Sequence, residues 1–546
     1  MPDLLTTAGS RGDRLTVRRL LEAPVRDDPG QEIVYRDQRR LTYRELRERI
    51  HRLAGALTAL GVRPGDTVAV MDYDSHRYLE AFFAVPMMGA ILHTVNVRLS
   101  PEQILYTVEH AGDDVILAHA DFLPILEHVR GRIDPATRYV LLSDDGASPA
   151  SHAVAFEGEY EALLAAAPPR FAFPDLPEDT RATTFYTTGT TGLPKGVSFT
   201  HRQLVLHTLG VLTALATAPH ASFRQGDVYM PITPMFHVHA WGLPYVATAL
   251  GVKQVYPGRY APDVLLGLIA REGVTFSHCV PTILHMLLHT PASGQVDLSG
   301  WKVLVGGAAM ARPLALAALG RGIDVLTGYG MSETCPVLTI AFLEPADLRR
   351  PPEEQAELRC RTGRTLPLVE VQVVDEAMAE RPRDGASTGE VVVRAPWLAA
   401  GYVKDPKGSE RLWEGGALHT GDVAWRDARG YLKITDRMKD VIKVGGEWVS
   451  SLELEDVIAA HPAVADVAVI GAPDAKWGER PLALVVPRPG QPAPTQRELH
   501  RHVKAQVEQG HLGKPALLIG VKAVEAIDRT SVGKVDKRAL REKHLG

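Results

Sequence analysis

Apolar residues recur at helical spacing between residues 43 and 61. Five of them follow one another at intervals of four, three, four and three residues: Leu46, Ile50, Leu53, Leu57 and Leu60. Side chains at these intervals lie on one face of an α-helix, so the pattern predicts an amphipathic helix. Gly61 comes directly after the last of them, at a position where glycine commonly ends a helix.

Short apolar runs follow this helix and alternate with further helical stretches. Runs typical of buried strands occur at residues 66–73, 139–144 and 302–307. Strands that alternate with helices indicate an α/β architecture with largely parallel sheets. We therefore expect a large N-terminal domain of this class.

The pattern changes from about residue 365. Residues 367–376, 389–395 and 430–437 are rich in β-formers and are separated by turn residues, which favours a small antiparallel, barrel-like subdomain. From residue 451 to the C-terminus, helical and strand patterns occur together in a stretch long enough to fold by itself. These features predict a small α+β domain at the C-terminus.

Composition narrows the possible classes of protein. A chain of 546 residues is too long for one hydrophobic core, and a net charge of -5 gives no electrostatic reason to bind nucleic acid. The three cysteines, Cys279, Cys335 and Cys360, are too scattered for a disulfide framework or a zinc site. The sequence shows neither a secretory signal nor an apolar run long enough for a transmembrane segment. We therefore expect a cytoplasmic protein with reduced thiols.

The stretch "TFYTTGTTGLPKGVSFTH", residues 184–201, has the composition of a phosphate-binding loop. Gly189 and Lys195 have the separation found in the Walker motif, but Pro194 and Gly196 replace its second glycine and its hydroxyl residue. Threonine hydroxyls, closely approaching backbone N–H groups and the lysine ammonium can nevertheless hold an anion together. Taken alone, the stretch could also be a polar surface turn.

Four further segments combine glycines with side chains suited to a ligand. They are "VLVGGAAM" (303–310), "TGYGMSET" (327–334), "HTGDVAW" (419–425) and "RTSVGKVDKRAL" (529–540). Among them they supply an aromatic ring, a lysine, and carboxylates that can accept hydrogen bonds from ribose hydroxyls. Each segment alone also fits a structural role, as a helix end, a core tyrosine, a turn aspartate or a surface lysine.

Taken together and in this order, the five segments resemble the adenylate-forming superfamily of acyl-CoA synthetases, peptide-synthetase adenylation domains and luciferases. The resemblance runs from about residue 40 to the C-terminus and includes "DRMKDVIKVGGEW" (436–448) as the hinge motif. It implies a reaction in two steps. The acid attacks the α-phosphate of ATP to give acyl-AMP and pyrophosphate, and a thiol then displaces AMP. ATP, Mg²⁺ and coenzyme A are the implied cofactor and co-substrates.

The resemblance also implies roles for individual residues. The loop that holds the β- and γ-phosphates would consist of Thr187, Thr188, Gly189, Thr190, Thr191 and Lys195. Thr187 and Glu333 are the candidates for contact with magnesium, since Mg²⁺ prefers oxygen ligands. The other nucleotide contacts would be Gly307 and Tyr329 at the adenine, with Gly328 beside them, Ser332 at the α-phosphate, Asp422 at the ribose, and Arg437 at the ribose or phosphates.

The implied catalytic residues are Lys534, Glu333, Thr188 and His237. Lys534 would stabilise the charge that develops during adenylation, for which a mobile ammonium is suited. In this superfamily the C-terminal domain then rotates, withdraws its lysine and opens a path for the thiol.

The same resemblance divides the chain into an adenylation domain, residues 1–436, and a mobile C-terminal domain, residues 437–546. The hinge would lie near Lys439, a position where many members of the superfamily carry aspartate. Lys443 and Trp448 follow the hinge and would face the nucleotide and the thiol path.

The segment "PMFHVHAWGLPYV", residues 234–246, resembles the region beside the acyl pocket of fatty acyl-CoA synthetases. His237 would lie near the acyl carboxylate, Trp241 could close an apolar tunnel, and Gly330 would contact the substrate. Core packing is the alternative role for Trp241, and His239 leaves a polar substrate tail possible. The branch that the chain resembles most is that of bacterial medium- and long-chain fatty acyl-CoA ligases, and we favour a medium-chain acid.

Several alternatives stay open at this point. A ligase for short, methylthio or aryl acids would use the same chemistry with another pocket. A carrier protein could replace coenzyme A, and a luciferase-like oxygenase would share the adenylation motifs. A sensor that binds an acyl nucleotide without turnover is the alternative of another class, although it would not need Lys534. A homodimer is expected from the resemblance only.

Overall fold

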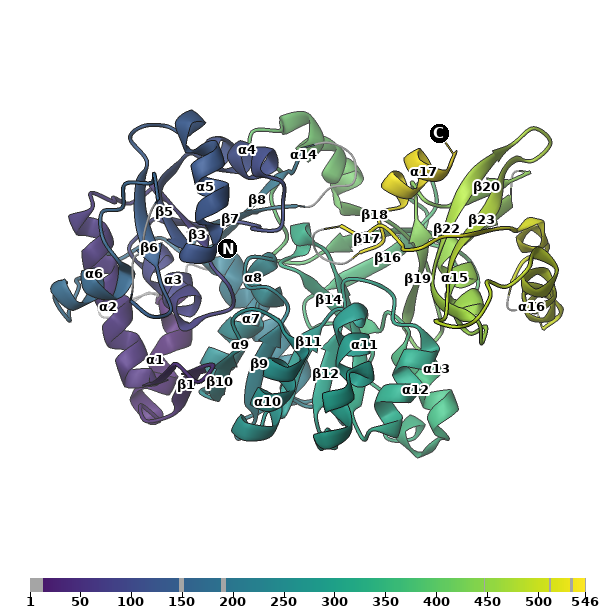
Figure 1. Ribbon diagram of the computed structural model, residues 1–546, viewed down its shortest axis with the longest axis horizontal. Helices are drawn as coiled ribbons and strands as arrows, with labels where there is room; N and C mark the ends of the chain where they lie inside the picture. The colour runs from purple at the N-terminus through teal and green to yellow at the C-terminus, as the bar shows by residue number, and fades with distance from the viewer. Residues whose placement is uncertain are drawn as a thin grey trace, which may run out of the picture.

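The computed structural model describes residues 13–146, 152–187, 193–445, 447–509, 512–530 and 534–545 (Figure 1). Within these residues, four sheets and the helices around them build the fold. The predicted α/β class with a small C-terminal unit is confirmed. Four of the predicted phosphate-loop residues lie outside the described residues: Thr188, Gly189, Thr190 and Thr191.

A six-stranded sheet lies in the N-terminal third of the chain. Its order is β6 (Arg138–Leu142), β5 (Asp113–His119), β3 (Thr67–Met71), β4 (Ile91–Thr94), β7 (Arg181–Tyr186) and β8 (Gly196–Thr200). All neighbouring strands are parallel except β7 and β8, which are antiparallel. The predicted phosphate loop is the connection between β7 and β8. The helices of this region are α1 (Arg18–Asp27), α2 (Tyr43–Ala59), α3 (His76–Met87), α4 (Pro101–Ala111), α5 (Leu123–Val129) and α6 (Tyr160–Ala166).

Helix α2 is the amphipathic helix that the apolar spacing predicts. It begins with a capping box, in which the Thr42 side chain accepts a hydrogen bond from the Glu45 N–H and the Glu45 carboxylate accepts one from the Thr42 N–H. Its leucines and Ile50 are buried up to Leu57. Gly61, just beyond the helix, has a φ of 91°, a conformation that glycine adopts without strain.

A nine-stranded sheet forms the centre of the molecule. Its order is β15 (Arg364–Thr365), β14 (Val337–Ile340), β13 (Asp324–Gly330), β12 (Lys302–Val305), β11 (Phe276–Cys279), β9 (Val228–Ile232), β10 (Lys253–Tyr256), β1 (Glu32–Tyr35) and β2 (Arg39–Thr42). The strands from β13 to β1 are parallel. Helices near this sheet are α7 (His201–Ala216), α8 (Val238–Trp241), α9 (Leu243–Leu250), α10 (Pro262–Glu272), α11 (Pro281–His289), α12 (Arg312–Gly320) and α13 (Pro352–Arg359).

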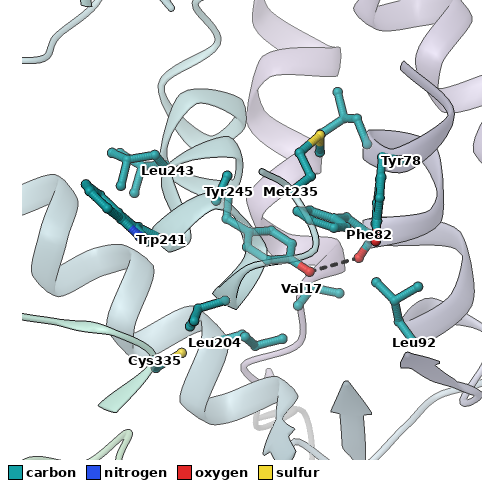
Figure 2. Close-up of a cluster of buried hydrophobic side chains, with 14 of the residues drawn as sticks. Val17, Tyr78, Phe82, Leu92, Leu204, Met235, Trp241, Leu243, Tyr245 and Cys335 are labelled. Atoms are coloured by element: carbon teal, nitrogen blue, oxygen red, sulfur yellow. Dashed lines mark hydrogen bonds between the residues drawn. The ribbon is translucent and has the colours of Figure 1, made fainter. Parts of the chain in front are cut away.

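The two large sheets share one hydrophobic core. Side chains from both sheets, and from α3, α7 and α9, pack in it. Figure 2 shows its centre, where the rings of Phe82 and Tyr245 stack with centroids 5.4 Å apart and the Tyr245 hydroxyl donates to the Phe82 carbonyl at 3.1 Å. Trp241 lies at the edge of this cluster. A second core fills the opposite face of the nine-stranded sheet, under α10, α11 and α12.

Two smaller sheets follow. The first is antiparallel and has the order β16 (Glu370–Val374), β17 (Gly389–Arg394), β18 (Leu418–Arg426) and β19 (Leu432–Arg437), with α14 (Pro406–Leu412) beside it. The second has the order β21 (Glu447–Val449), β20 (Ile442–Val444), β23 (Gly478–Pro487) and β22 (Val464–Asp474), and β24 (Gly520–Ala523) pairs with β23. Residues 438–441, which include Lys439, connect the two sheets.

The C-terminal sheet has a hydrophobic core of its own, with helices α15 (Ser451–Ala459), α16 (Gln496–Glu508) and α17 (Lys537–Leu545) around it. Helix α15 also packs against β19 of the preceding sheet. Across the described ranges, no helix has the length and apolarity needed to cross a bilayer. The three cysteines are buried free thiols.

Candidate active site

A cavity of about 40 Å³ opens where strands β12 and β13 end. Eight of the predicted site residues line it: His237, Trp241, Gly307, Gly328, Tyr329, Gly330, Ser332 and Lys534. Lys534 reaches it from the loop before α17, whereas the others come from the large sheet and from the segment that follows β9. The carboxyl ends of parallel strands are the usual place for a ligand in an open α/β sheet.

The glycines around the cavity permit close approach of backbone segments. A Cβ on Gly330 would lie 1.8 Å from the carbonyl oxygen of Pro336, so no other residue fits there. A Cβ on Gly306 would lie 2.9 Å from the Gly328 carbonyl oxygen and 3.0 Å from the ring of Trp241. Gly307 has a φ of 80°, which favours glycine. The glycines thus let the backbone and the Trp241 ring approach each other closely at the end of β12.

Asp422 stands between Tyr329 and Arg437. The Tyr329 hydroxyl donates to Oδ2 of Asp422 at 2.7 Å, and Nε of Arg437 lies 3.2 Å from Oδ1. Burial and the Asp422 carboxylate raise the pKa of Tyr329 well above its ordinary value, so its hydroxyl stays protonated. The structure thus brings together three of the residues predicted to lie at the adenine and the ribose.

Glu333 is buried beside the cavity and is joined to Lys195 through a residue that the sequence analysis missed. The Tyr402 hydroxyl donates to Oε1 of Glu333 at 2.7 Å, and the Lys195 ammonium lies 4.2 Å from the centre of the Tyr402 ring. Nζ of Lys195 also lies 3.7 Å from Oδ2 of Asp405. Tyr402 follows Gly401, and this glycine–aromatic pair is the sequence signal that could have identified it.

The base of the predicted phosphate loop is closed by its two ends. The Thr187 N–H donates to the Lys195 carbonyl at 2.9 Å, and the Lys195 N–H donates to the Thr187 hydroxyl at 3.3 Å. The Glu333 carboxylate, through Tyr402, and the Thr187 hydroxyl are therefore both linked to Lys195. Their oxygen atoms fit a Mg²⁺ ion that keeps several of its water ligands. The described residues hold no group of three or more His, Cys, Asp or Glu side chains that would form a closed metal cage.

Two titratable groups face each other across the cavity. The pKa of Lys534 is lowered to about 8, mainly by burial and then by the charge of Arg437, while Asp422 and Glu333 oppose this shift. The pKa of His237 is lowered to about 3 by burial, by Lys534 and by Arg98. Lys534 is thus a buried cation at neutral pH, and His237 is neutral at physiological pH.

The segment that carries Trp241 has an unusual backbone. The φ angles of Val238, His239, Ala240 and Trp241 are 48°, 54°, 48° and 59°. Left-handed backbone is costly for residues with a Cβ, by about 1–2 kcal/mol each, so other contacts must hold this turn in place. One of them is a hydrogen bond of 2.7 Å between Nε2 of His239 and the Thr183 hydroxyl. His239 therefore braces the turn and makes a core contact.

The left-handed turn places the Trp241 ring over the end of β12. The ring meets Gly306, and its centroid lies 5.1 Å from that of His278 on β11. Only 6% of Trp241 is exposed. Trp241 therefore belongs to the core and also closes one wall of the cavity, so the two roles considered for it do not exclude each other.

Several predicted residues that the structure describes do not line the cavity itself. Thr187, Lys195, Glu333, Asp422 and Arg437 make the contacts given above, whereas Lys439, Lys443 and Trp448 lie in or beyond the hinge segment. Lys443 and Trp448 lie on β20 and β21, and both are exposed, Trp448 by 44%. Lys439 lies in the connection between the two small sheets. Of the predicted residues beyond the hinge segment 438–441 that the structure describes, Lys534 lines the cavity.

Comparison with known proteins agrees with this arrangement. Residues 21–403 match the family described as AMP-binding enzyme, and residues 453–534 match its C-terminal domain. A long-chain-fatty-acid–CoA ligase of Thermus thermophilus is 42% identical over 509 residues, which cover 92% of this chain and 90% of the relative. A 3-methylmercaptopropionyl-CoA ligase of Ruegeria lacuscaerulensis is 37% identical over 513 residues, 92% of each chain.

Among solved structures, ATP-bound MatB from Rhodopseudomonas palustris superposes with a TM-score of 0.82 at 26% sequence identity, over 97% of this chain and 99% of MatB. The matches extend through both the large part of the chain and the C-terminal unit that supplies Lys534. The chain belongs to the AMP-binding enzyme family.

Proposed function

We propose that this chain is an AMP-forming ligase that activates a fatty acid as acyl-AMP and transfers the acyl group to coenzyme A, with release of AMP and pyrophosphate. One observation carries the proposal: Lys534, Tyr329 and Ser332 line the same cavity. One wall of that cavity is the apolar core around Trp241. The similarity to the long-chain ligase of Thermus supports a fatty acid as the substrate.

The residues of the cavity suit the adenylation step. This step brings the carboxylate of the acid up to the α-phosphate, so stabilisation of negative charge is its main requirement. Lys534 would supply a positive charge there, since a pKa of about 8 leaves it largely protonated at neutral pH. His237 would line the carboxylate path without adding charge, and Asp422 would accept hydrogen bonds from the ribose hydroxyls.

Mg²⁺ would be held by Glu333 and by the hydroxyl of Thr187, directly or through water. When bound, it supplies positive charge that neutralises the phosphate oxygens. The Tyr402 hydrogen bond fixes the orientation of the Glu333 carboxylate through Oε1.

For the second step we propose that residues 437–546 rotate as a unit about a hinge near Lys439, relative to residues 1–436. Support comes from the two separate sheets that end and begin on either side of residues 438–441. Further support comes from Lys443 and Trp448, which face solvent here and would need a rotation to reach the nucleotide or the thiol. The rotation would withdraw Lys534 and admit coenzyme A.

A ligase for short or methylthio acids is the second candidate. The Ruegeria relative, a 3-methylmercaptopropionyl-CoA ligase, favours it, and so does the way in which Trp241 and His278 limit the space beneath the cavity. Both candidates share the nucleotide chemistry and differ in the acid. For either one, the cytoplasm, where ATP and coenzyme A occur together, is the proposed location, and a homodimer is the proposed assembly.

The test separates the two steps. Purified protein is incubated with ATP, Mg²⁺ and octanoate in the absence of coenzyme A, and acyl-AMP is sought by mass spectrometry. Coenzyme A is then added and acyl-CoA is measured. We expect acyl-AMP to form first and acyl-CoA to form after coenzyme A is added. In Lys534→Ala, neither product should form from the acid and ATP. Absence of acyl-AMP with every acid tried would contradict the proposal.

A further inference from the structure

A second lysine, Lys537, lies in the loop-to-helix junction that carries Lys534. It is the first residue of α17 and is only 7% exposed. Buried ammonium groups need partners, because an unpaired charge away from water is strongly destabilising. Its Nζ donates to the Ser451 hydroxyl and lies 2.8 Å from Oε1 of Glu455. Both partners belong to α15, so Lys537 ties α17 to α15.

Ser451 in turn connects α15 to the sheet on the other side of the hinge segment. Its backbone N–H and its hydroxyl both lie 2.6 Å from Oδ2 of Asp436, a residue of β19. Asp436 is 1% exposed and Ser451 is fully buried. The neighbouring Ser450 hydroxyl also donates to the carbonyl of Thr435. The contact between α15 and β19 therefore rests on directed, buried hydrogen bonds.

Lys534 and the residue before α17 are both hydrogen-bonded to the segment 528–530. Thr530 donates its N–H to the Lys534 carbonyl at 2.7 Å, and the Lys534 N–H donates to the Thr530 hydroxyl at 3.2 Å. Beside them, the Asp536 N–H donates to the Asp528 carbonyl at 2.8 Å. A displacement of the start of α17 would therefore move Lys534 as well.

We propose that Lys537 is a positioning residue for Lys534: the network Asp436–Ser451–Lys537 locks the C-terminal unit in the orientation that inserts Lys534 into the cavity. The inference rests on the proposed function, because it assigns this orientation to adenylation. Lys537 does not line the cavity. It acts through Ser451, which lies between the ammonium of Lys537 and the carboxylate of Asp436. Rotation for the second step would break the Ser451–Asp436 contacts and leave the Lys537–Glu455 pair intact within the C-terminal unit.

A positioning role for Lys537 predicts that its substitution slows one step of the reaction and spares the other, which a purely structural role would not. Lys537→Met keeps most of the length of the side chain and removes its charge, and Asp436→Ala removes the acceptor on the opposite side of the hinge. Each variant should slow acid-dependent exchange of pyrophosphate into ATP by about tenfold or more, which corresponds to about 1.4 kcal/mol. Formation of thioester from supplied acyl-AMP should stay within about twofold. Because both variants break one network, the double variant should lose no more than the more affected single variant.

Two further variants and a control separate the positioning role of Lys537 from a loss of folding. Lys537→Arg keeps the charge and should restore most of the exchange rate. Ser451→Ala removes one hydroxyl and should give the same split between the two steps even if Lys537→Met folds poorly. Lys504→Met is the matched control: Lys504 lies on α16 of the same unit, its side chain is 56% exposed, and its pair with Glu508 is a surface contact of 3.6 Å. Neither step should change in it.

A readout without turnover separates this inference from the proposed function. Competitive labelling of amines, followed by mass spectrometry, gives the pKa of Lys534 in protein without substrates. In Lys537→Met, Lys534 should become more reactive at high pH like an exposed lysine, whereas Lys504→Met should match the wild type. If the wild type shows no ligase activity but Lys537→Met still changes the labelling of Lys534, the ligase proposal is refuted and the network is supported. Equal losses in both steps, or an unchanged exchange rate with unchanged Lys534 labelling, would overturn the inference.

Discussion

The hydroxyl of Tyr329 donates a hydrogen bond of 2.7 Å to the carboxylate of Asp422, although 93 positions separate the two residues in sequence. The same carboxylate receives Arg437 at 3.2 Å. An aromatic ring from the large sheet, a carboxylate from the antiparallel sheet and an arginine next to the hinge segment thereby form one group. A nucleotide bound there would contact the nine-stranded sheet and the antiparallel sheet at once.

Asp422→Ala should weaken binding of ATP much more than binding of the acid. The substitution removes the proposed ribose acceptor and leaves Arg437 and the Tyr329 hydroxyl without their shared partner. We expect the KM for ATP to rise by about tenfold or more, with a small change in the KM for the acid. Steady-state kinetics with each substrate varied in turn will measure both. Asp263→Asn, at an exposed carboxylate on α10, is the control, and a selective rise in the KM for the acid would count against the ribose role.

The rate of adenylation should depend on pH through Lys534. Burial lowers its pKa from the ordinary value of 10.5 to about 8, and its charged form is the one that the reaction needs. The charged form is therefore complete well below pH 8 and is lost as the pH rises through about 8. We expect kcat/KM for adenylation, which reports the free enzyme, to fall above that pH. In Lys534→Arg the guanidinium stays charged, so the fall should disappear; a fall that persists would assign the titration to another group.

Trp241→Ala should change the preference for acyl chain length. The indole closes one wall of the cavity against Gly306 and His278, so its removal opens apolar space beneath the carboxylate site. We expect the rate maximum to move toward longer or bulkier acids. The check is kcat/KM across a series of fatty acids. Trp477→Ala, on the exposed surface of the C-terminal unit, is the matched control. An unchanged profile in Trp241→Ala would leave this residue with a packing role alone.

Lys439→Pro should impair the second step selectively. Proline fixes φ and removes an N–H, which restricts the connection between β19 and β20 about which the C-terminal unit would rotate. Pyrophosphate exchange should remain near the wild-type rate, while formation of thioester from supplied acyl-AMP should fall by about tenfold or more. Stopped-flow or quenched assays of each step will show the split. Normal overall turnover would place the pivot elsewhere.

The sequence predicts the α/β architecture because strict apolar spacing and turn residues are local signals. Helix α2, with its capping box at Thr42 and Glu45, is such a case. Tyr329, Asp422 and Lys534 were found because each stands in a recognisable glycine-rich segment.

Other features depend on partners that are distant in the sequence. The left-handed turn at Val238–Trp241 is held by tertiary contacts such as His239 with Thr183, and no residue in it is a glycine. Tyr402 matters because Glu333 lies opposite its hydroxyl. The burial of Lys537 follows from the position of α17 beside α15. No local sequence pattern encodes these tertiary contacts, so they become visible only in the structure.

Whether the chain is a fatty acyl-CoA ligase can be tested by the release of pyrophosphate from ATP across a panel of acids. The panel runs from acetate to octadecanoate, includes aryl and methylthio acids, and is assayed with and without coenzyme A. We expect acid-dependent release that coenzyme A accelerates, with the highest rate for a fatty acid between hexanoate and dodecanoate. A maximum at a short, methylthio or aryl acid would keep the ligase chemistry and replace the substrate. Absence of release with every acid would contradict the account.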